Sequence, residues 1–397
     1  MSGLDLESAK RRVVEEVERQ SDLLLDVSHR IHDRPELLFE ETYAADLLAH
    51  ALGANGLEVE RRAYGLDTAL SARAGETDGE GPTVAVLCEY DALPRIGHGC
   101  GHNVIAAAGL GAGLAAAAVA AEAGGGVLVL GTPAEEGGGG KVLMGERGAF
   151  DGVDAAMMVH PAGLDLTEPE VLAIATLRVE YQGRGAHAAA SPEHGRNALD
   201  AAVLGYNAVA ALRQHIAASE KVHGIFVEAG EKPNIVPDRA VAEWYVRSET
   251  RASLQPLKER VLACLEAGAT AAGCDMEWAP IAPEYADLRT NRPLVELYRA
   301  NSAELGRPVA EPSSRRRIMA STDMGNVSHW VPSIHPMVAA SPPDVSLHSA
   351  EFAGWAASPE GDRAVLDGAK AMAMTTVDLW LRPEAMAEVR AAFDPAP

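Results

Sequence analysis

The spacing of hydrophobic residues predicts helices at the start of the chain. Residues 7–32 place hydrophobic side chains, among them Val13 and Val17, every three or four positions, and therefore on one side of a helix. A second helix is predicted over about 41–54, because the Asn-Gly pair that follows it is a common helix end. The chain therefore opens with two helical segments.

Three short apolar runs in the next part of the chain each end in polar or ionisable residues. They lie in the segments 82–94, 126–140 and 155–161, with helical patterns between them. A buried strand of a parallel sheet has this appearance when it delivers side chains to a site at its carboxyl end. The pattern predicts an α/β domain with a site along one edge of its sheet.

The middle of the chain has a different pattern. Residues 176–188 alternate polar and apolar side chains, as a half-exposed strand does, and the elements there follow the order β-α-β-β-α-β. This order predicts a small α+β, ferredoxin-like domain inserted into the α/β domain. The predicted boundaries are a catalytic domain at 1–173 and 288–397, and an inserted lid and dimerisation domain at 174–287.

Composition and charge exclude several classes of function. The 397 residues carry a net charge of −23, whereas a nucleic-acid surface needs clustered Lys and Arg, so no nucleic-acid partner is expected. The alanine-rich stretch 105–122 is interrupted by three glycines, so no membrane span is expected. The polar N-terminus does not resemble a signal peptide, and the four cysteines lack the spacing of a disulfide scaffold. A cytoplasmic protein is expected.

The segment GHGCGHN, residues 97–103, places a cysteine and two histidines within five residues, as a metal site, a nucleophile or a tight turn would. Similar side chains end the other apolar runs. The candidates are Asp91, Cys100, His102, Glu135, Glu136, His160 and the later His348. Thiolate, imidazole and carboxylate groups are zinc ligands. Any one of them alone is more often a hydrogen-bonded loop residue, but the set occupies the positions where a parallel sheet places its active site.

The adjacent carboxylates of Glu135 and Glu136 suggest a division of roles. Neighbouring residues beyond a strand point in different directions, so one carboxylate can bind a metal while the other faces a water molecule. A hydrolase needs its general base in that second position. A solvated acidic pair is the alternative, but the flanking GTP and GGGG segments favour backbone that packs closely around a ligand.

Several long motifs resemble those of a known enzyme family. They are EYDALPRIGHGCGHN, GTPAEEGGGGK, GRGAHAAASPEHGRNALDA, KPNIVP and STDMGNVS. In this order they resemble the zinc-dependent amidohydrolases of the aminoacylase and carboxypeptidase type. The resemblance runs over about residues 20–385 and is strongest to the branch that contains β-alanyl-lysine dipeptidases and aminobenzoyl-glutamate hydrolases.

The resemblance implies a site with two divalent metal ions, zinc or manganese. The implied ligands are Cys100 as the bridging residue, with His102, Glu136, His160 and His348. Glu135 would be the general base, and Asp91 would orient a ligand histidine. Glu89 departs from the His or Asp that many relatives carry at this position, so it is not counted as a ligand.

The resemblance also implies residues outside the metal site. His187 of the lid would reach into the active site of the other chain of a homodimer and stabilise the oxyanion. Asn234 would be a second lid contact. Arg315, in the basic triplet before STDMGNVS, is a candidate for binding the substrate carboxylate. His98 matches no ligand of the family, so a structural role is expected.

The expected reaction is metal-dependent hydrolysis of the amide bond in a small N-acyl- or aminoacyl-amino acid, by a dipeptidase or amidohydrolase. Within the same branch, an N-acyl-amino-acid deacylase or an aminobenzoyl-glutamate hydrolase is the alternative. A catalytically silent, metal-stabilised scaffold is a further alternative, and the complete set of candidate residues argues against it. A hydrolase with Cys100 as nucleophile would leave Glu135 and Glu136 unexplained, and a chelator should leave it active.

Overall fold

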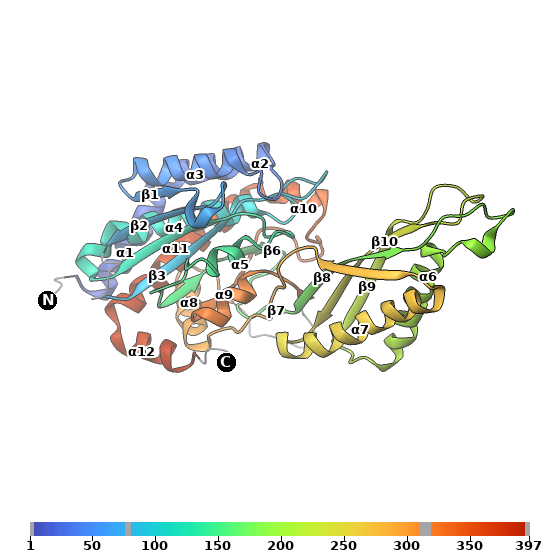
Figure 1. Ribbon diagram of the computed structural model, residues 1–397. Coiled ribbons are helices and arrows are strands. Elements are labelled where there is room, and N and C mark those ends of the chain that lie inside the picture. Colours follow the sequence, from blue (N-terminus) through green and yellow to red (C-terminus); the bar gives the residue numbers. More distant parts are fainter. Residues whose placement is uncertain (1–3, 76–80, 310–318, 394–397) are drawn as a thin grey trace. The chain divides into compact units, whose positions relative to one another are not determined.

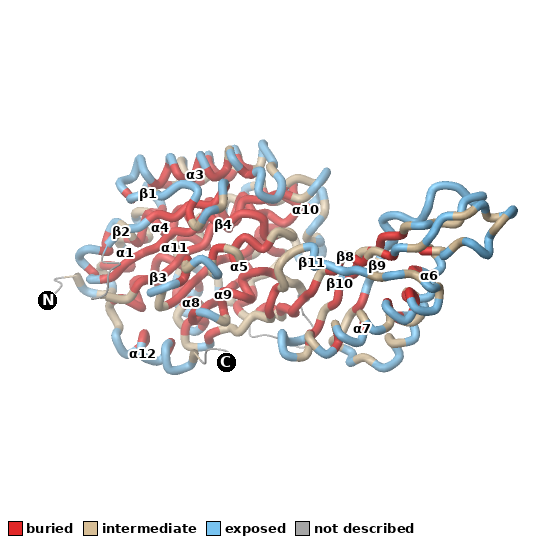
Figure 2. Tube along the Cα trace, viewed as in Figure 1, coloured by how far each residue is buried: buried red, intermediate tan, exposed pale blue. Residues whose placement is uncertain are grey.

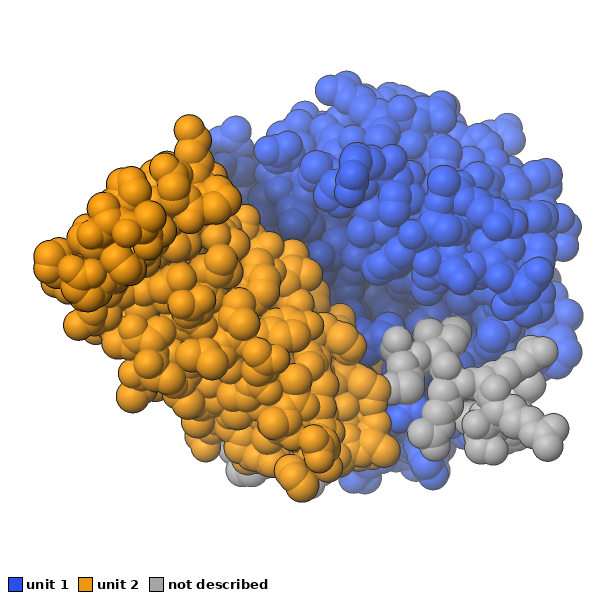
Figure 3. Space-filling model, turned by 90° about the vertical axis from the view of Figure 1, so that its right-hand side faces the viewer, with its two compact units in different colours: residues 1–170, 288–397 blue, residues 171–287 orange. Residues whose placement is uncertain are grey.

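The computed structural model describes residues 4–75, 81–309 and 319–393 of the chain. It divides into two compact units (Figure 3), unit 1 with residues 1–170 and 288–397, and unit 2 with residues 171–287. Each unit contains its own cluster of buried hydrophobic residues. The sequence placed these divisions after residues 173 and 287, and the structure places them after residues 170 and 287.

Unit 1 is built on a six-stranded mixed sheet (Figure 1). In spatial order its strands are β1 (Glu58–Arg61), β2 (Leu70–Gly75), β4 (Gly126–Thr132), β3 (Thr83–Glu89), β5 (Ala155–Met157) and β13 (Ser333–Ile334). The pairs from β4 to β13 are parallel, and β1 and β2 add an antiparallel edge. Every residue of β3 and β4 is buried, which explains why their sequences are almost continuously apolar.

Helices pack on this sheet and on one another. The longer ones are α1 (Leu6–Arg19), α2 (Ser21–Asp33), α3 (Thr42–Ala54), α4 (His102–Ala123), α8 (Arg292–Glu304), α11 (Pro359–Leu381) and α12 (Pro383–Ala391). Shorter helices are α5 (Gly140–Gly145), α9 (Met324–Trp330) and α10 (Ala350–Trp355). The helix predicted over 41–54 is confirmed. The periodic segment 7–32 forms two helices, because the backbone of Gln20 leaves the helical region between them.

Helix α4 lies in the core of unit 1, where Figure 2 shows most of its residues buried. Its glycines do not interrupt it, so α4 is long and apolar enough to cross a membrane, but 83% of its apolar window is buried within the protein. The glycines allow it to approach the sheet closely. A Cβ atom on Gly109 would lie 2.6 Å from the Sγ of Cys88, and one on Gly113 would lie 2.2 Å from Val129.

The third apolar run contributes to two strands instead of one. Residues 155–157 form β5 of the main sheet, and β6 (His160–Ala162) pairs in parallel with β14 (Met337–Ala339). A second short pair joins β7 (Glu170–Val171) and β12 (Met319–Ala320). The break between β5 and β6 places His160 at the start of a strand.

Unit 2 is an α+β domain with a four-stranded antiparallel sheet. In spatial order its strands are β11 (Asp275–Pro280), β8 (Ala173–Gln182), β10 (Arg239–Ser248) and β9 (Lys221–Glu228). Helices α6 (Ala198–Leu212) and α7 (Arg251–Ala272) pack against each other and against this sheet over the buried Trp244 and Tyr181. The chain order is β-α-β-β-α-β, so the predicted α/β fold with an inserted ferredoxin-like domain is confirmed.

Candidate metal centre

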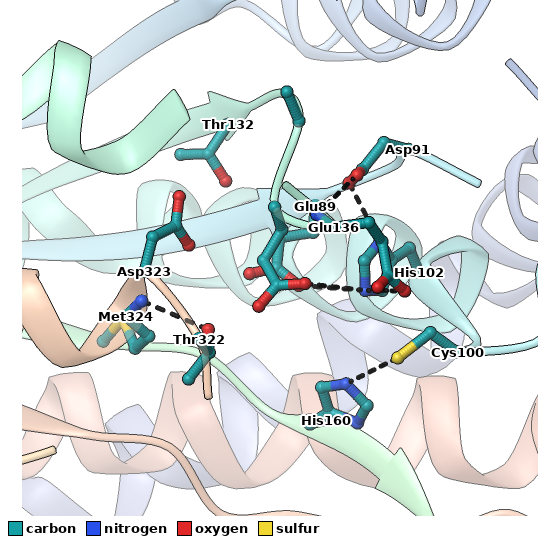
Figure 4. A network of polar contacts seen from close by, with 12 residues as sticks. Glu89, Asp91, Cys100, His102, Thr132, Glu136, His160, Thr322, Asp323 and Met324 are labelled. Atoms are coloured by element: carbon teal, nitrogen blue, oxygen red, sulfur yellow. Dashed lines mark hydrogen bonds and ion pairs between the residues drawn. The ribbon is translucent and has the colours of Figure 1, made fainter. Parts of the chain in front are cut away.

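Parallel strands β3 and β4 end side by side and place the candidate residues at one edge of the sheet. Glu89, the last residue of β3, pairs in register with Thr132, the last residue of β4. Asp91 follows β3 by two residues, and Glu135 follows β4 by three. Figure 4 shows the side chains of Glu89, Asp91 and Glu136 close to that of His102, with Cys100 beside them. The predicted site residues therefore lie together at the carboxyl edge of the sheet.

Asp91 orients two of its neighbours. One of its carboxylate oxygens lies 3.0 Å from Nδ1 of His102, and the other accepts the backbone N–H of Glu136, also at 3.0 Å. In the neutral ring, Nδ1 of His102 donates to this carboxylate and Nε2 carries the lone pair that faces the centre. Nε2 of His102 lies 3.8 Å from a carboxylate oxygen of Glu135 and 3.9 Å from one of Glu136. This geometry supports the predicted orienting role of Asp91.

Cys100 and His160 meet on another side of the centre. The Sγ of Cys100 lies 3.4 Å from Nε2 of His160, and both side chains are buried. Nδ1 of His160 lies 2.8 Å from the carbonyl oxygen of Pro161, so it donates to that oxygen and leaves Nε2 free to act as a ligand. The thiol of the loop residue Cys100 and the imidazole of His160, in strand β6, therefore lie next to each other.

His348 comes from the C-terminal part of unit 1. Its Nε2 lies 3.5 Å from a carboxylate oxygen of Glu136, and its backbone N–H donates to the carbonyl of Gly99 at 2.8 Å. The side chain is about half exposed, with 55% of its surface accessible. His348 has a left-handed backbone, with φ at 59°, and so does Ala134, directly before Glu135, at 58°. Such conformations in non-glycine residues are often found at functional sites.

The donor atoms of these residues fit divalent cations. Three sets of donors each lie within 4.8 Å of one another: Cys100 with His102 and His160, Cys100 with Glu136 and His348, and Glu89 with His102 and Glu135. Buried donor atoms of Glu89, His102 and Glu136 have no hydrogen-bond partner among the described residues. Unpaired buried polar atoms are costly, so a ligand that satisfies all three would stabilise the site. Nitrogen, oxygen and sulfur donors in this mixture are typical of zinc.

Burial dominates the electrostatics of the centre. It raises the pKa of Glu135, and the nearby carboxylates of Glu89 and Glu136 raise it further. Burial, followed by the proximity of Glu136, also raises the pKa of the Cys100 thiol. Burial lowers the pKa of His160 to about 4, helped by the neighbouring His102. Each of these pKa shifts favours the neutral form of a buried group. A bound cation would reverse the shifts of the acidic groups, because it would stabilise their charged forms.

Two further buried residues, which the sequence did not single out, lie beside the centre. Lys141, in α5, donates its Nζ to Glu89 and, at 2.6 Å, to Asp323, and its backbone N–H donates to the other oxygen of Asp323 at 2.9 Å. Both Lys141 and Asp323 are fully buried. They belong to the motifs GGGGK and STDMGNVS, and a lysine directly after four glycines was the available signal.

Glu41 is a third buried group near the site that the sequence did not identify. It accepts the backbone N–H of Ala134 at 2.9 Å, one residue before Glu135. Burial, with a contribution from Asp91, raises the pKa of Glu41 to about 7. Glu41 thereby fixes the backbone from which the predicted general base projects.

The glycines after Glu136 pack closely against the backbone that precedes it. A Cβ atom on Gly140 would lie 1.9 Å from the carbonyl oxygen of Pro133, and Gly139 adopts a left-handed conformation with φ at 67°. His98 is buried and its Nε2 lies 3.0 Å from the carbonyl of Ile31, outside the three donor sets. This arrangement fits the structural role expected for His98.

The predicted lid residues lie together in unit 2. His187 and Asn234 are both exposed, and the backbone carbonyl of Asn234 accepts the N–H of Ala188 at 3.1 Å. Nδ1 of His187 accepts the backbone N–H groups of Ala189 and Ala190, at 3.2 and 3.1 Å. Their roles in the reaction stay predictions. The predicted carboxylate-binding residue Arg315 lies outside the described residues.

Comparison with known proteins identifies a family. A family model described as peptidase family M20/M25/M40 matches residues 85–367, a span that contains every predicted metal ligand and both predicted lid residues. The chain is 38% identical to the Xaa-Arg dipeptidase of Mus musculus, over 99% of this chain and 94% of the mouse protein. It is 30% identical to one of the subunits of the p-aminobenzoyl-glutamate hydrolase of Escherichia coli K12, over 65% of this chain and 58% of that protein.

The fold agrees with these sequence comparisons. A solved structure of a dinuclear metal-binding peptidase of the M20 family from Bacillus subtilis matches with a TM-score of 0.68 and 19% identity, over 91% of this chain and 98% of that one. The resemblance inferred from the motifs is therefore confirmed. Since the family model covers most of the chain and a dipeptidase aligns with almost all of it, the chain belongs to peptidase family M20/M25/M40.

Proposed function

We propose that this chain is a dipeptidase that uses two divalent metal ions to hydrolyse the amide bond of a small aminoacyl- or N-acyl-amino acid. The observation that carries this proposal is the arrangement of two donor sets that share Cys100, next to the carboxylate of Glu135. The likeness to the mouse Xaa-Arg dipeptidase over almost the whole chain supports a dipeptide as the substrate.

Five residues would hold the ions in this proposal, with Asp91 orienting one of them. They are Cys100 between the two positions, with His102, Glu136, His160 and His348. When bound, divalent ions polarise the scissile carbonyl and make a water molecule more acidic. The thiolate and imidazole donors favour zinc, and manganese is the alternative for the carboxylate.

Glu135 would act as the general base. Its carboxylate is buried and lies beside the ligand atoms, 3.8 Å from Nε2 of His102, where it can accept a proton from the attacking water. The same carboxyl group then donates that proton to the amine of the leaving amino acid. Burial raises the pKa of Glu135, which helps it hold the proton between the two steps.

A second copy of the chain would supply the lid residues. Nδ1 of His187 accepts two backbone N–H groups, so the ring proton is on Nε2, which can donate to a developing oxyanion. Asn234 would contact the substrate from the adjacent loop. Edge strand β9 exposes Ile225 and Val227, a surface that a homodimer could cover. We further propose a cytoplasmic location, where the four free cysteines would stay reduced.

The substrate class follows from charge and from the relatives. The net charge of −23 favours the approach of a cationic dipeptide, in line with the Xaa-Arg dipeptidase likeness. The likeness to the aminobenzoyl-glutamate hydrolase of Escherichia coli supports the second candidate, an N-acyl-amino-acid hydrolase with an acidic or neutral leaving group.

A substrate panel with metal-reconstituted protein tests the proposal. Dipeptides with C-terminal Arg or Lys, N-acetyl-amino acids and aminobenzoyl-glutamate are compared by kcat/KM, before and after removal of metal with a chelator. We expect turnover of the basic dipeptides that is lost on chelation and restored by zinc or manganese. Full activity without metal would contradict the proposal and favour Cys100 as a nucleophile. No turnover of any panel member by the metal-loaded chain would favour a silent scaffold.

A further inference from the structure

Glu89 has one carboxylate oxygen in a buried ion-pair network and the other facing the metal centre. The first oxygen accepts a hydrogen bond from Nζ of Lys141. Nζ also donates to one oxygen of Asp323, and the backbone N–H of Lys141 donates to the other. The second, Oε2, is buried and has no hydrogen-bond partner within the described part of the chain. All three side chains are fully buried. Lys141 and Asp323 therefore fix the orientation of Glu89, because neither can move without leaving a buried charge unpaired.

This second oxygen of Glu89 faces a ring nitrogen of His102. It lies 3.4 Å from Nε2 of His102, which also lacks a hydrogen-bond partner in the described ranges, since His102 uses its Nδ1 for Asp91. Two lone pairs that face each other in a buried site repel unless a proton or a metal ion lies between them, and a metal centre supplies the metal ion. Two donors that bind one tetrahedral zinc ion, each at about 2.1 Å, lie about 3.4 Å apart. The observed separation therefore suits a shared metal ion.

The negative charge of the metal centre and of the Lys141 network beside it also favours bound cations. The centre and the network beside it contain five buried or nearly buried carboxylates and one ammonium group, that of Lys141; the carboxylates are those of Glu89, Asp91, Glu135, Glu136 and Asp323. When all five are ionised and the histidines are neutral, four negative charges have no counterion among these residues, and two divalent ions would balance them. Glu89 carries its charge directly beside a ligand atom, so it belongs to the part of the cluster that the ions neutralise.

We propose that Glu89 is a further protein ligand of the metal centre, through Oε2, and that Lys141 and Asp323 are positioning residues that aim it. This inference rests on the two-metal site of the proposed function and revises the sequence-based exclusion of Glu89. The carboxylate would share with His102 the ion nearer to Glu135. Its second oxygen stays with Lys141, so Glu89 binds through a single oxygen.

Three isosteric variants test the inference: Glu89→Gln, Lys141→Met and the double variant. If Glu89 is a ligand, Glu89→Gln weakens the affinity for one of two ions by at least about 10–100-fold, the loss that follows removal even of an outer partner. The double variant removes the lysine as well as the carboxylate. Its metal affinity should stay low, which shows that the loss in Glu89→Gln does not come from the lysine left with one partner fewer. Lys141→Met keeps the carboxylate but no longer aims it, so two ions should still bind, one of them with a lower affinity than in the wild type.

Metal affinity is measured by competition with a chromogenic chelator, and the ligand set by the visible absorption of the cobalt-substituted protein. Loss of an oxygen ligand should change the cobalt spectrum in both variants that lack Glu89, whereas Lys141→Met should keep the oxygen ligand and show a smaller change. A double variant with wild-type affinity and an unchanged spectrum would overturn the inference, because Glu89 would then serve only to pair Lys141. A wild-type chain that binds no cation would instead reject the proposed function itself, and this inference with it.

Discussion

Glu135 and Glu136 are neighbours in the sequence, but their side chains meet different partners. Both carboxylates lie near Nε2 of His102, but the carboxylate of Glu136 also faces His348 and its backbone N–H donates to Asp91, whereas Glu135 belongs to the donor set that contains Glu89. The left-handed backbone of Ala134 precedes them and sets the direction in which both project. At this scale, two chemically identical residues differ only in their surroundings.

The two glutamates should therefore respond differently to the same substitution. Glu135→Gln is expected to keep both metal ions and the fold but to lower kcat by about 10²–10⁴-fold, the usual contribution of a general base. Glu136→Gln is expected to lower the metal content, because it removes a ligand charge. Elemental analysis and steady-state kinetics on both variants check this. Metal loss in Glu135→Gln together with metal retention in Glu136→Gln would show that the two roles are exchanged.

Glu41 makes the stability of the metal-free protein depend on pH. Burial raises its pKa from 4.5 to about 7, so the folded state keeps a proton that the unfolded state releases. Between pH 4.5 and 7 the unfolded state thus binds fewer protons, and this group lowers the free energy of unfolding as the pH rises. Glu41→Gln keeps an acceptor for the N–H of Ala134 and removes the titration.

Urea unfolding at pH 5 and pH 8 measures this effect. From pH 5 to pH 8 the free energy of unfolding of Glu41→Gln, measured relative to that of the wild type, should rise by about 1–3 kcal/mol. This size follows from the shift in the pKa of Glu41. The adjacent and exposed Glu40 offers a matched control, and Glu40→Gln should follow the wild type. Equal pH dependence in Glu41→Gln and the wild type would mean that Glu41 ionises normally in the folded chain.

At the scale of elements, the sequence predicted what local pattern determines. The sequence pattern was enough to predict the buried strands β3 and β4 and the position of candidate residues at their carboxyl ends. It also predicted the β-α-β-β-α-β order of unit 2. The break at Gln20 was not predicted, because hydrophobic periodicity continues across it. The contact of Lys141 with Asp323 joins residues 182 positions apart and depends on how α5 and α9 pack, which no local pattern records.

Helix α4 illustrates how packing outweighs helix propensity. Gly109→Ala would improve the propensity of the helix by about 1 kcal/mol. The added Cβ would lie 2.6 Å from both the Sγ of Cys88 and the carbonyl oxygen of Leu87 in β3, so we expect a net destabilisation of about 1–3 kcal/mol.

Gly53→Ala in α3 is the matched control, since its Cβ would lie 3.8 Å from the nearest atom, Val59 Cγ2. We expect it to stabilise the protein by about 0.5–1 kcal/mol. Thermal unfolding of both variants gives the comparison. A Gly109→Ala protein as stable as Gly53→Ala would mean that α4 can move away from the sheet at little cost.

At the scale of the whole molecule, the proposed active site needs two chains, and mixing tests it. A His187→Ala chain is refolded with a Glu135→Gln chain, and exchange of chains is verified by mass. Each homodimer should be nearly inactive, because loss of an oxyanion donor costs about 10²–10³ in rate and loss of the base at least as much. The mixed dimer contains one site with both groups intact and should show about half of the wild-type activity. No recovery would place His187 in its own chain's site, or outside the reaction.

The insertion of unit 2 into unit 1 has a consequence for synthesis on the ribosome. Unit 2 is one continuous segment, whereas unit 1 needs residues 288–397 to supply β13 beside β5, helix α11 beside α4, and His348. The nascent chain can therefore complete unit 2 while the first half of unit 1 still exposes apolar α4. At about 5–20 residues per second, that interval lasts on the order of ten seconds. During it α4 lacks the cover of α11, and the proposed metal site is completed only when His348 has been added.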